Sequence, residues 1–453
     1  MHSFPIPYTT DASACYDAIA DMPWAVWLDS AGLGRYDILC AQPVMTLVTH
    51  GDTTDITDAT GTRCVTDDPF DLLRRQLGAP VVPMPEVPFA GGAVGYWGYD
   101  LTRRLMILPS RLKNAEQMPD MAVGIYDWAI VFDHREKTSR LLSHRHDPHT
   151  ALMLTDLAAR LQTRTVSRTS EFKVHGCIES NLTRAGYQSA FDAIQRYLLA
   201  GDCYQVNLAQ RYAAQAEGNA FQAYLQLRRL SPAPYSAFLN LPQAQILCAS
   251  PERFLHVQEG LVETKPIKGT RPRMADMLHD AQVADELRHS RKDIAENLMI
   301  VDLLRNDLGK SCVPGSVQVP KLFEVESYAQ VHHLVSTVTG QLADGQDALT
   351  LLRHCFPGGS VTGAPKQRAM QIIEQLEPNQ RGVYCGAMGY VGYDGNMDSN
   401  IAIRTLVYSN SEIRFWAGGG IVADSEVAAE YQETLDKAAA MLKLLQQFGG
   451  KYG

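Results

Sequence analysis

The sequence predicts an α+β protein in which large β-sheets are layered and helices lie outside them. The chain has 453 residues, of which 45% are hydrophobic and 20% are charged, so it can bury a large core. Strand-like and helix-like patterns alternate along the whole chain, and no internal repeat is visible. No stretch approaches the roughly 18 apolar residues that a membrane-spanning helix needs.

Residues 1–165 have the pattern of an N-terminal region of strands and short helices. Strands are expected at 24–29 and 36–49, joined by a glycine turn, and a hairpin at 122–132 and 139–143. Residues 68–77 have the pattern of a short helix. The glycines between 91 and 98 alternate with bulky residues, which indicates tight strand packing and does not match a dinucleotide-binding loop. The polar stretch 163–180 is the expected boundary.

After the boundary, in residues 180–450, strands alternate with longer helices. Helices are expected at 184–200, 221–230, 278–308, 348–354, 365–376 and 426–447. Gly201 and Gly309 end two of them, and Pro365 occupies the first turn of another. Asp424 or Ser425 is the expected N-cap of the last. Strands are expected at 203–211, 235–241, 245–249, 254–257, 382–393 and 399–407.

Charge and cysteine usage exclude several classes. The net charge is −9 and there is no basic tract, which argues against nucleic acid or an anionic membrane as partner. The nine cysteines are scattered and form no Cys-x-x-Cys pair, as expected of reduced thiols. The first residues lack the basic and apolar segments of a signal peptide. We therefore expect a cytoplasmic protein.

Lys268 lies in the stretch Glu-Thr-Lys-Pro-Ile-Lys-Gly-Thr-Arg-Pro-Arg, residues 263–273. Its two prolines and its glycine predict a rigid turn between a strand and a helix. A nucleophilic lysine must be neutral, which costs about 4–5 kcal/mol at pH 7 unless burial or a nearby cation supplies it. The alternative is a solvated loop lysine.

Three carboxylates are candidates for a metal site. Glu296 lies on a helix followed by apolar residues, and Glu430 and Glu433 are three apart on one face of another. If the two helices meet, these groups suit Mg²⁺, which prefers few protein oxygens. The alternative is two solvated helix faces with ordinary ion pairs.

Residues 357–366 and 418–420 are glycine-rich, and helices are expected after both. Such segments offer free backbone N–H groups to an anion, although neither has the spacing of a phosphate-binding P-loop. Arg404 follows an alternating strand and could clamp a carboxylate. Glu252 and His333 are acid–base candidates. The alternatives are that the glycine-rich segment 357–366 is an ordinary helix start, that Glu252 pairs with a neighbouring arginine, and that His333 is a buried core residue.

Taken together, these strings resemble the chorismate-utilising enzyme family. The matching segments are 201–208, 250–254, 266–270, 295–308, 332–337, 357–366, 403–405 and 418–433. The resemblance is close over about residues 180–447 and looser before them. It implies a sandwich of large, mainly antiparallel β-sheets with helices outside, as in anthranilate synthases, the two regions being intertwined and the site lying between the sheets.

Two positions indicate the branch of the family. Anthranilate synthases carry Ala where Lys268 stands, whereas the aminodeoxychorismate branch has this lysine and uses it to attack C2 of chorismate. Isochorismate and salicylate synthases carry a water-activating lysine where this chain has Gln205. The resemblance therefore implies that chorismate and ammonia give 4-amino-4-deoxychorismate through a covalent Lys268 intermediate, on the path to 4-aminobenzoate and folate.

The resemblance also implies roles for the other candidates. Glu252 is the general acid, and Glu296, Glu433 and Glu430 hold Mg²⁺. The chorismate-binding residues are Arg404, Thr362, Gly363, His333, Gly418, Gly419, Gly420 and Lys437. A glutamine amidotransferase subunit supplies the ammonia. A tryptophan pocket that holds its ligand structurally is expected from Ser30, Leu33, Gly34, Arg35, Tyr36, Pro234, Tyr235 and Ser236.

Three alternatives remain at this stage. Anthranilate synthase component I shares every motif except Lys268. An isochorismate-type enzyme is disfavoured by Gln205. A catalytically inactive protein that binds tryptophan is disfavoured by the intact set Glu252, Lys268, Glu296 and Glu433.

Overall fold

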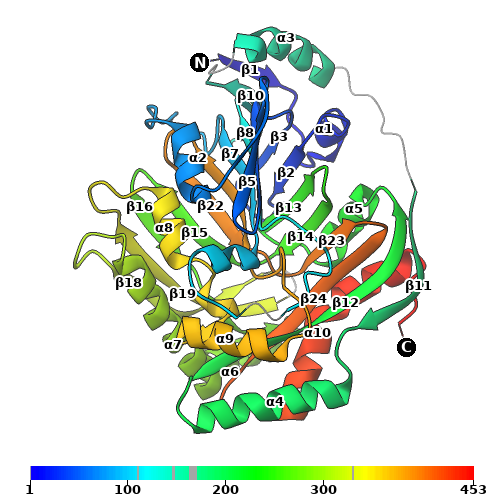
Figure 1. Ribbon diagram of the computed structural model, residues 1–453, viewed down its shortest axis with the longest axis vertical. Coiled ribbons are helices and arrows are strands. Elements are labelled where there is room, and N and C mark those ends of the chain that lie inside the picture. Colours follow the sequence, from blue (N-terminus) through cyan, green and yellow to red (C-terminus); the bar gives the residue numbers. More distant parts are fainter. Residues whose placement is uncertain (1, 110–111, 145–147, 163–170, 329–330, 453) are drawn as a thin grey trace.

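Two large β-sheets pack face to face, and helices cover their outer surfaces (Figure 1). The computed structural model describes residues 2–109, 112–144, 148–162, 171–328 and 331–452. Within these residues each sheet has 12 strands, and neighbouring strands pair antiparallel. The predicted α+β class and the mainly antiparallel sheets are confirmed.

The first sheet contains strands from both ends of the chain. Its order is β1 (His2–Ile6), β10 (Thr138–Ser143), β9 (Trp128–Asp133), β3 (Tyr36–Cys40), β2 (Ala25–Asp29), β13 (Tyr235–Asn240), β14 (Gln245–Ser250), β23 (Thr405–Ser409), β24 (Glu412–Ile421), β12 (Gln205–Gly218) and β11 (Phe172–Ser180), with β20 (Gly363–Ala364) paired to β12. N-terminal and C-terminal strands meet where β2 pairs with β13.

The second sheet is composed in the same way. Its order is β17 (Ile267–Pro272), β19 (Val331–Gln341), β16 (Leu261–Thr264), β15 (Arg253–Gln258), β22 (Met397–Ile401), β21 (Ala387–Gly392), β7 (Gly92–Trp97), β8 (Met121–Tyr126), β4 (Met45–His50), β5 (Thr53–Asp58) and β6 (Gly61–Val65), with β18 (Gln318–Ser327) paired to β19. Here the two parts of the chain meet where β7 pairs with β21.

The helices pack against the two sheets. They are α1 (Ser13–Asp17), α2 (Pro69–Leu77), α3 (Pro148–Gln162), α4 (Arg184–Leu199), α5 (Phe221–Leu230), α6 (Met277–His289), α7 (Arg291–Gly309), α8 (Ala348–Cys355), α9 (Lys366–Leu376) and α10 (Val427–Gln447), with 3₁₀ turns η1 (Tyr99–Arg104) and η2 (Gly359–Val361). Helix α10 packs on β24, α9 on β12 and α7 on β19. These three helices therefore lie beside the part of the sandwich formed by the later strands.

A hydrophobic core between the sheets holds the sandwich together. It joins Val26 and Leu239 of the first sheet to Val94, Tyr96 and Met388 of the second. Separate apolar clusters lie beneath the helices on each outer face. Both faces of the central strands are therefore buried, which explains why they appear in the sequence as continuous apolar runs.

The chain crosses between the two sheets at four places where the sequence predicted continuous or adjacent strands. The predicted strand 36–49 is divided into β3 and β4, and 122–132 is divided into β8 and β9. The chain crosses again between β14 and β15, and the predicted strand 399–407 is divided into β22 and β23. Alternation cannot reveal a change of sheet, because the residues stay apolar on both sides of each crossing.

Three further local predictions were wrong. The predicted helix 278–308 breaks at Ser290, whose extended backbone and hydroxyl cap the start of α7. The predicted turn around Lys268 is strand β17, with a bulge at Gly269 that accounts for the glycine. The N-cap of α10 is Glu426, and it makes no side-chain cap; Ser425 instead donates its hydroxyl to Glu430.

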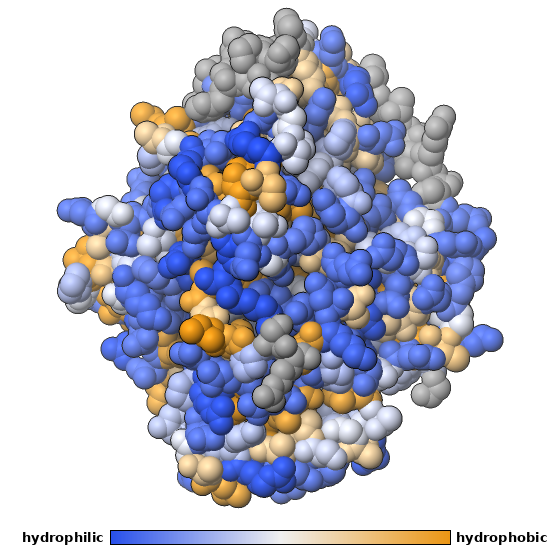
Figure 2. Space-filling view, in the orientation of Figure 1, coloured by the Kyte–Doolittle hydropathy of each residue, from blue (hydrophilic) through white to orange (hydrophobic). Residues whose placement is uncertain are grey.

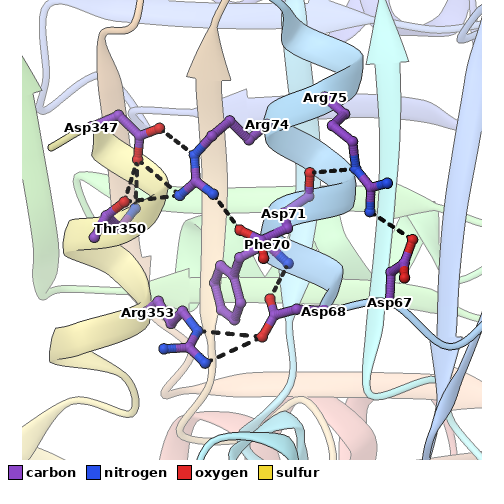
Figure 3. A network of polar contacts seen from close by, with 9 residues as sticks. All are labelled: Asp67, Asp68, Phe70, Asp71, Arg74, Arg75, Asp347, Thr350 and Arg353. Carbon is purple, nitrogen blue, oxygen red and sulfur yellow. Dashed lines mark hydrogen bonds and ion pairs between the residues drawn. The ribbon is translucent and has the colours of Figure 1, made fainter. Parts of the chain in front are cut away.

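A polar network at the surface ties α2 to α8 (Figure 3). Arg74 donates to Asp347 at 2.6 Å and to Thr350 at 2.8 Å, and Arg353 donates to Asp68 at 3.3 Å. Asp68 also accepts from the N–H of Phe70 and so caps α2. The network fastens an N-terminal helix to a C-terminal one.

The face of the molecule seen in Figure 2 is mainly hydrophilic, and its hydrophobic side chains form small separate patches. Among the residues that the structure describes, no helix is both long and apolar enough to span a bilayer.

Candidate active site

A cavity of about 710 Å³ lies between the two sheets in the C-terminal part of the sandwich. Strands β12 and β24 of the first sheet, β17 and β19 of the second, and helices α7 and α10 contribute to its wall. Five basic and five acidic side chains line it, namely Lys268, Arg271, Lys292, Arg404 and Lys437, and Glu252, Asp293, Glu296, Glu433 and Asp436. The cavity suits a small, strongly polar ligand.

Lys268 projects into this cavity from β17. Its Nζ donates to the backbone oxygen of Ser360 at 3.1 Å. Burial lowers the pKa of the Lys268 amine from 10.5, and Lys437 adds to this effect, while Glu296 and Glu252 oppose it. The site therefore provides the desolvation that a neutral, nucleophilic lysine requires.

Glu252 lies at the crossing between β14 and β15 and is 6% exposed. Burial raises the pKa of its carboxyl group above 4.5, against the opposing effects of a Ser360 hydrogen bond and the Lys268 charge. Its backbone oxygen accepts from the N–H of Ile401, which holds this crossing against the end of β22. The predicted acid is thus buried beside the predicted nucleophile.

The three predicted metal ligands lie on α7 and α10, and these helices approach one another here. The Lys292 Nζ lies 3.9 Å from Glu296 and 3.4 Å from Glu430, so one cation already bridges the two helices. A Cβ on Gly419 would lie 3.1 Å from Glu433 and 3.3 Å from Glu430. Glu430 Oε2 is buried and has no hydrogen-bond partner among the residues that the structure describes. Glu296 and Glu433 therefore line a part of the cavity that attracts cations, whereas Glu430 does not line it.

No group of three or more acidic, histidine or cysteine side chains is already gathered into a metal-binding cluster among the residues that the structure describes. Oxygen donors of this kind nevertheless suit Mg²⁺, which retains several waters. The charges of Lys437, Lys292 and Lys268 outweigh the effect of burial and lower the pKa of Glu433 below 4.5. Glu433 is therefore an anion, as a metal ligand must be.

Arg404 lies at the crossing between β22 and β23 with a left-handed backbone, φ 50°. Its side chain lines the cavity, and neither an ion pair nor a side-chain hydrogen bond holds it among the described residues. Burial lowers its pKa from 12.5. A desolvated guanidinium without a carboxylate partner is suited to bind an anionic ligand.

His333 lies on β19 and is 3% exposed. Its Nδ1 is 2.9 Å from the Thr270 hydroxyl. Burial and the neighbouring Arg404 lower the pKa of His333 to about 4, so the imidazole is neutral at pH 7. It lines the cavity, as predicted, in the form of a neutral hydrogen-bonding group.

The predicted glycine cradle at 418–420 lies in the cavity wall, but it is part of strand β24 and not a loop that enters a helix. These glycines pair with residues 207–209 of β12. A Cβ on Gly418 would lie 2.4 Å from the oxygen of Leu208, and one on Gly420 1.8 Å from Gln205 Nε2. Lys437 donates to the Gly418 oxygen at 3.0 Å and pairs with Glu433 at 2.7 Å.

Thr362 and Gly363 lie behind the cavity wall and do not line it. The Thr362 hydroxyl donates to Gly358 at 3.1 Å, within its own loop. Gly363 pairs with β12, and a Cβ there would lie 2.1 Å from the oxygen of Gln205. Their placement at the cavity surface is therefore corrected, because the 3₁₀ turn η2 presents Ser360 and Val361 instead.

Several lining residues were not singled out from the sequence. They are Asn207, Arg271, Lys292, Ser360, Tyr384 and Trp416. Tyr384 and Trp416 stack with ring centroids 6.0 Å apart, and Asn207 donates to Ser360 at 3.0 Å. No sequence pattern marks these residues, because strands distant in the chain bring them together.

A second, smaller cavity of about 100 Å³ lies between the sheets next to β2 and β13. Of the predicted tryptophan-binding residues, Tyr36, Pro234, Tyr235 and Ser236 line it. The other four, Ser30, Leu33, Gly34 and Arg35, do not. Two of these four bond elsewhere, Ser30 to Asp37 and Arg35 to Asp133 and Glu86.

A family model described as chorismate binding enzyme matches residues 25–443. The match covers strands of both sheets and every wall of the larger cavity. The chain belongs to the chorismate-binding enzyme family.

Curated members of the chorismate-binding family are similar over nearly the full length. Aminodeoxychorismate synthase component 1 from Klebsiella aerogenes is 47% identical over 97% of this chain and 98% of its own. The protein of the same name from Escherichia coli is 47% identical over 96% and 97%. Anthranilate synthase component 1 from Streptomyces coelicolor is 37% identical over 92% of this chain and 82% of its own.

Solved structures of family members share the architecture. Anthranilate synthase component I from Streptococcus pneumoniae matches with a TM-score of 0.81 and 32% identity, over 90% of this chain and 92% of that one. The isochorismate synthase MenF from Escherichia coli matches with a TM-score of 0.73 at 19% identity, over 98% and 94%, which shows the fold alone. The sandwich is thus common to proteins whose names indicate different reactions.

Proposed function

We propose that this protein is component 1 of an aminodeoxychorismate synthase and converts chorismate and ammonia to 4-amino-4-deoxychorismate. The observation that carries the proposal is Lys268, half-buried in the cavity wall, whose pKa is lowered by desolvation of its amine. Relatives with this name at 47% identity over nearly the whole chain support it.

Lys268 acts as the nucleophile. Its neutral amine adds to C2 of chorismate, both ring double bonds shift by one position, and the protonated C4 hydroxyl leaves as water. Ammonia then adds at C4, both double bonds return, and the lysine amine is expelled from C2. Two displacements with allylic shift restore the original ring pattern, so the net change is replacement of the hydroxyl by an amino group with release of water.

Glu252 supplies the proton for the leaving hydroxyl. A general acid must be protonated when substrate binds, and burial raises the pKa of this carboxyl toward that state. Ser360 lies beside both catalytic groups, because its backbone oxygen accepts from Lys268 while its side chain bonds to Glu252. Ser360 thus fixes the positions of the acid and the nucleophile relative to each other.

Chorismate is a dianion, and its carboxylates need cationic partners. Arg404 and Lys437 line the cavity and are the proposed binding groups, with neutral His333 and the glycines of β24 completing the surface. Equal numbers of acidic and basic side chains line the cavity, so their charges cancel. A bound divalent cation would make the net charge positive and so favour an anionic substrate.

Glu296, Glu430 and Glu433 are the proposed Mg²⁺ ligands, directly or through water. The fit rests on the position of Lys292 between Glu296 and Glu430 and on the buried Glu430 oxygen, which has no hydrogen-bond partner in the described part of the chain. When bound, Mg²⁺ supplies positive charge to a substrate carboxylate and disfavours the ammonium form of nearby lysines.

The partner proposed is a glutamine amidotransferase subunit that supplies ammonia, as the words "component 1" in the relatives' names suggest. We also propose that the smaller cavity binds tryptophan. Six cysteines are buried free thiols, namely Cys40, Cys203, Cys248, Cys312, Cys355 and Cys385, which supports a cytoplasmic location.

Intact-mass and peptide mass spectrometry test the proposal. The enzyme is incubated with chorismate and Mg²⁺ without ammonia, and a chorismate-derived adduct on the peptide containing Lys268 is expected. With ammonium added, the product should give 4-aminobenzoate only after a lyase is supplied. Direct release of fluorescent anthranilate would instead assign the anthranilate synthase reaction and overturn the proposal.

A further inference from the structure

Glu377 and Arg381 form a buried ion pair directly behind the wall of the larger cavity. Glu377 follows the last residue of α9. Arg381 donates to its two carboxylate oxygens at 2.6 and 3.0 Å, and the side chains are 1% and 3% exposed. Neither residue lines the cavity, and the proposed reaction does not use either.

The pair makes three hydrogen bonds to the backbone of residues that do line the cavity. Arg381 donates to the oxygen of Val361 at 3.0 Å and to that of Asn207 at 3.0 Å. Glu377 accepts from the N–H of Ala209 at 2.9 Å. The guanidinium also lies 4.9 Å from the ring of Tyr99, so packing fixes its plane. The planar guanidinium of Arg381 thus links η2 to β12.

These contacts lead directly to the proposed nucleophile. Ser360, which precedes Val361, accepts a hydrogen bond from Lys268 at 3.1 Å and one from the Asn207 side chain at 3.0 Å. The Ser360 side chain bonds to Glu252. Arg381 therefore binds the backbone oxygen of Val361, which follows Ser360 in the chain, and that of Asn207, whose side chain is hydrogen-bonded to Ser360.

We propose that Arg381 and Glu377 are positioning residues that fix the Ser360 backbone, and through it the Lys268 amine, relative to the bound substrate. This inference rests on the function proposed above. Burying an ion pair costs desolvation energy, and apolar residues often replace such pairs without loss of stability. The three backbone contacts need the guanidinium of Arg381 and the carboxylate of Glu377. Apolar side chains could not make these contacts, which explains why an ion pair occupies this position.

A second buried pair on the same helix provides a matched control. Glu374 of α9 is 2% exposed and pairs with Arg103, which also contacts Asp100 and the oxygen of Pro109. None of these four residues lines the cavity, and no hydrogen bond joins the Arg103 or Glu374 side chain to a lining residue among the described ones. Disturbing this pair tests the effect of losing a buried ion pair as such.

The test compares Arg381→Lys and Glu377→Gln with Arg103→Lys and Glu374→Gln, using chorismate, saturating ammonium and Mg²⁺. Misplacement of a reacting group by about 1 Å costs on the order of 10²-fold in rate. We expect kcat to fall about 10–100-fold in the first two variants while KM for chorismate changes less than about threefold. The rate of adduct formation at Lys268 should fall by the same factor. Arg381→Lys should lose more, because lysine cannot contact both backbone oxygens.

The control variants should retain kcat and KM within about threefold. Equal losses in both pairs, or a loss confined to KM, would overturn the inference. If Arg381→Lys does not fold by circular dichroism, the isosteric Glu377→Gln decides the question, and failure of both to fold would assign the pair a structural role only. An inactive wild-type enzyme that forms no adduct would instead overturn the proposed function.

Discussion

The two cavities between the sheets differ in how their charged groups are satisfied. In the smaller cavity Asp398 pairs with Arg253 at 2.9 Å, and Asp29 accepts from Tyr224 at 2.6 Å and pairs with Arg228. In the larger cavity, Arg404 has no carboxylate partner among the described residues. Among the same residues, the Lys268 amine is hydrogen-bonded only to the backbone oxygen of Ser360.

Under the proposed function, this difference distinguishes a ligand-binding pocket from a catalytic one. A satisfied wall recognises a ligand by shape and a few hydrogen bonds, whereas buried charges without partners cost stability and are retained where a ligand or a reaction uses them. Mutations at the larger cavity should therefore change the turnover of chorismate, through kcat or KM, whereas mutations at the smaller one should change ligand affinity with little effect on turnover.

The largest effect should come from Lys268→Ala. Loss of the nucleophile should lower kcat by on the order of 10⁴-fold and abolish the covalent adduct, while the circular dichroism spectrum stays unchanged. Lys265→Ala is the control, because Lys265 lies three residues away on the same segment and pairs with Glu326 at 2.6 Å outside the cavity. Unchanged product formation in Lys268→Ala would refute the covalent role.

Removal of divalent cations should have the next largest effect. Loss of several kcal/mol of charge stabilisation corresponds to about 10³-fold in rate, restored by added Mg²⁺. Mg²⁺ should also raise the melting temperature of the wild type and not that of Glu296→Gln with Glu433→Gln. Indifference of both rate and melting temperature to chelator would contradict the metal site.

Glu252→Gln should lower kcat/KM by about 10²-fold and change its pH dependence. The reaction needs the Lys268 amine deprotonated, so the rate falls at low pH, and Glu252 protonated, so it falls at high pH. Burial lowers the pKa of Lys268 from 10.5 and raises the pKa of Glu252 from 4.5, and both shifts extend the pH range in which the two groups have the required protonation states. The variant should lose the fall at high pH; a bell-shaped profile that persists would exclude Glu252 as the acid.

Arg404→Lys should raise KM for chorismate by about 10–100-fold, since a charged hydrogen bond contributes roughly 1.5–3 kcal/mol and lysine cannot form the two-pronged contact. Steady-state kinetics measure this. Arg253→Lys, which alters a pair at the smaller cavity, is the matched control and should change KM less than about threefold. Equal KM values in the two variants would argue against Arg404 as a substrate ligand.

The smallest effect on rate should come from Ser236→Val in the smaller cavity. Ser236 is buried and lines this cavity. The variant should lose the rise in melting temperature that tryptophan gives the wild type, and keep kcat within about twofold. Titration calorimetry with tryptophan checks the affinity. A wild type that does not bind tryptophan would contradict the predicted ligand.

The sequence predicted the fold class, most helices, and a set of charged residues of which nearly all line one cavity. Lys268, Glu252 and Arg404 were found because rigid or alternating segments flank them. Thr362 and Gly363 were misplaced because a glycine-rich string does not show which of its residues faces inward. Helices α1 and α3 and strands β1, β5, β6, β11, β16, β18 and β24 were not predicted, and β11 lies within the expected boundary 163–180.

The remaining differences have a common physical cause. The strand pairs β3–β4, β8–β9 and β22–β23 are each one apolar stretch in the sequence, and they divide because the chain passes from one sheet to the other. Ser360, Asn207 and Lys292 entered the site through contacts between elements more than 60 residues apart. A single sequence carries no local signal for such contacts.

The joining of N-terminal to C-terminal strands in both sheets has a consequence for synthesis of the chain. Strands β2 and β7 find their partners, β13 and β21, only after about 200 and 290 further residues have been made. Until then each presents an open apolar edge that can pair with another nascent chain. Truncated forms that end at α3 should therefore aggregate, and the enzyme should depend on chaperones or slow translation to reach its native state in high yield.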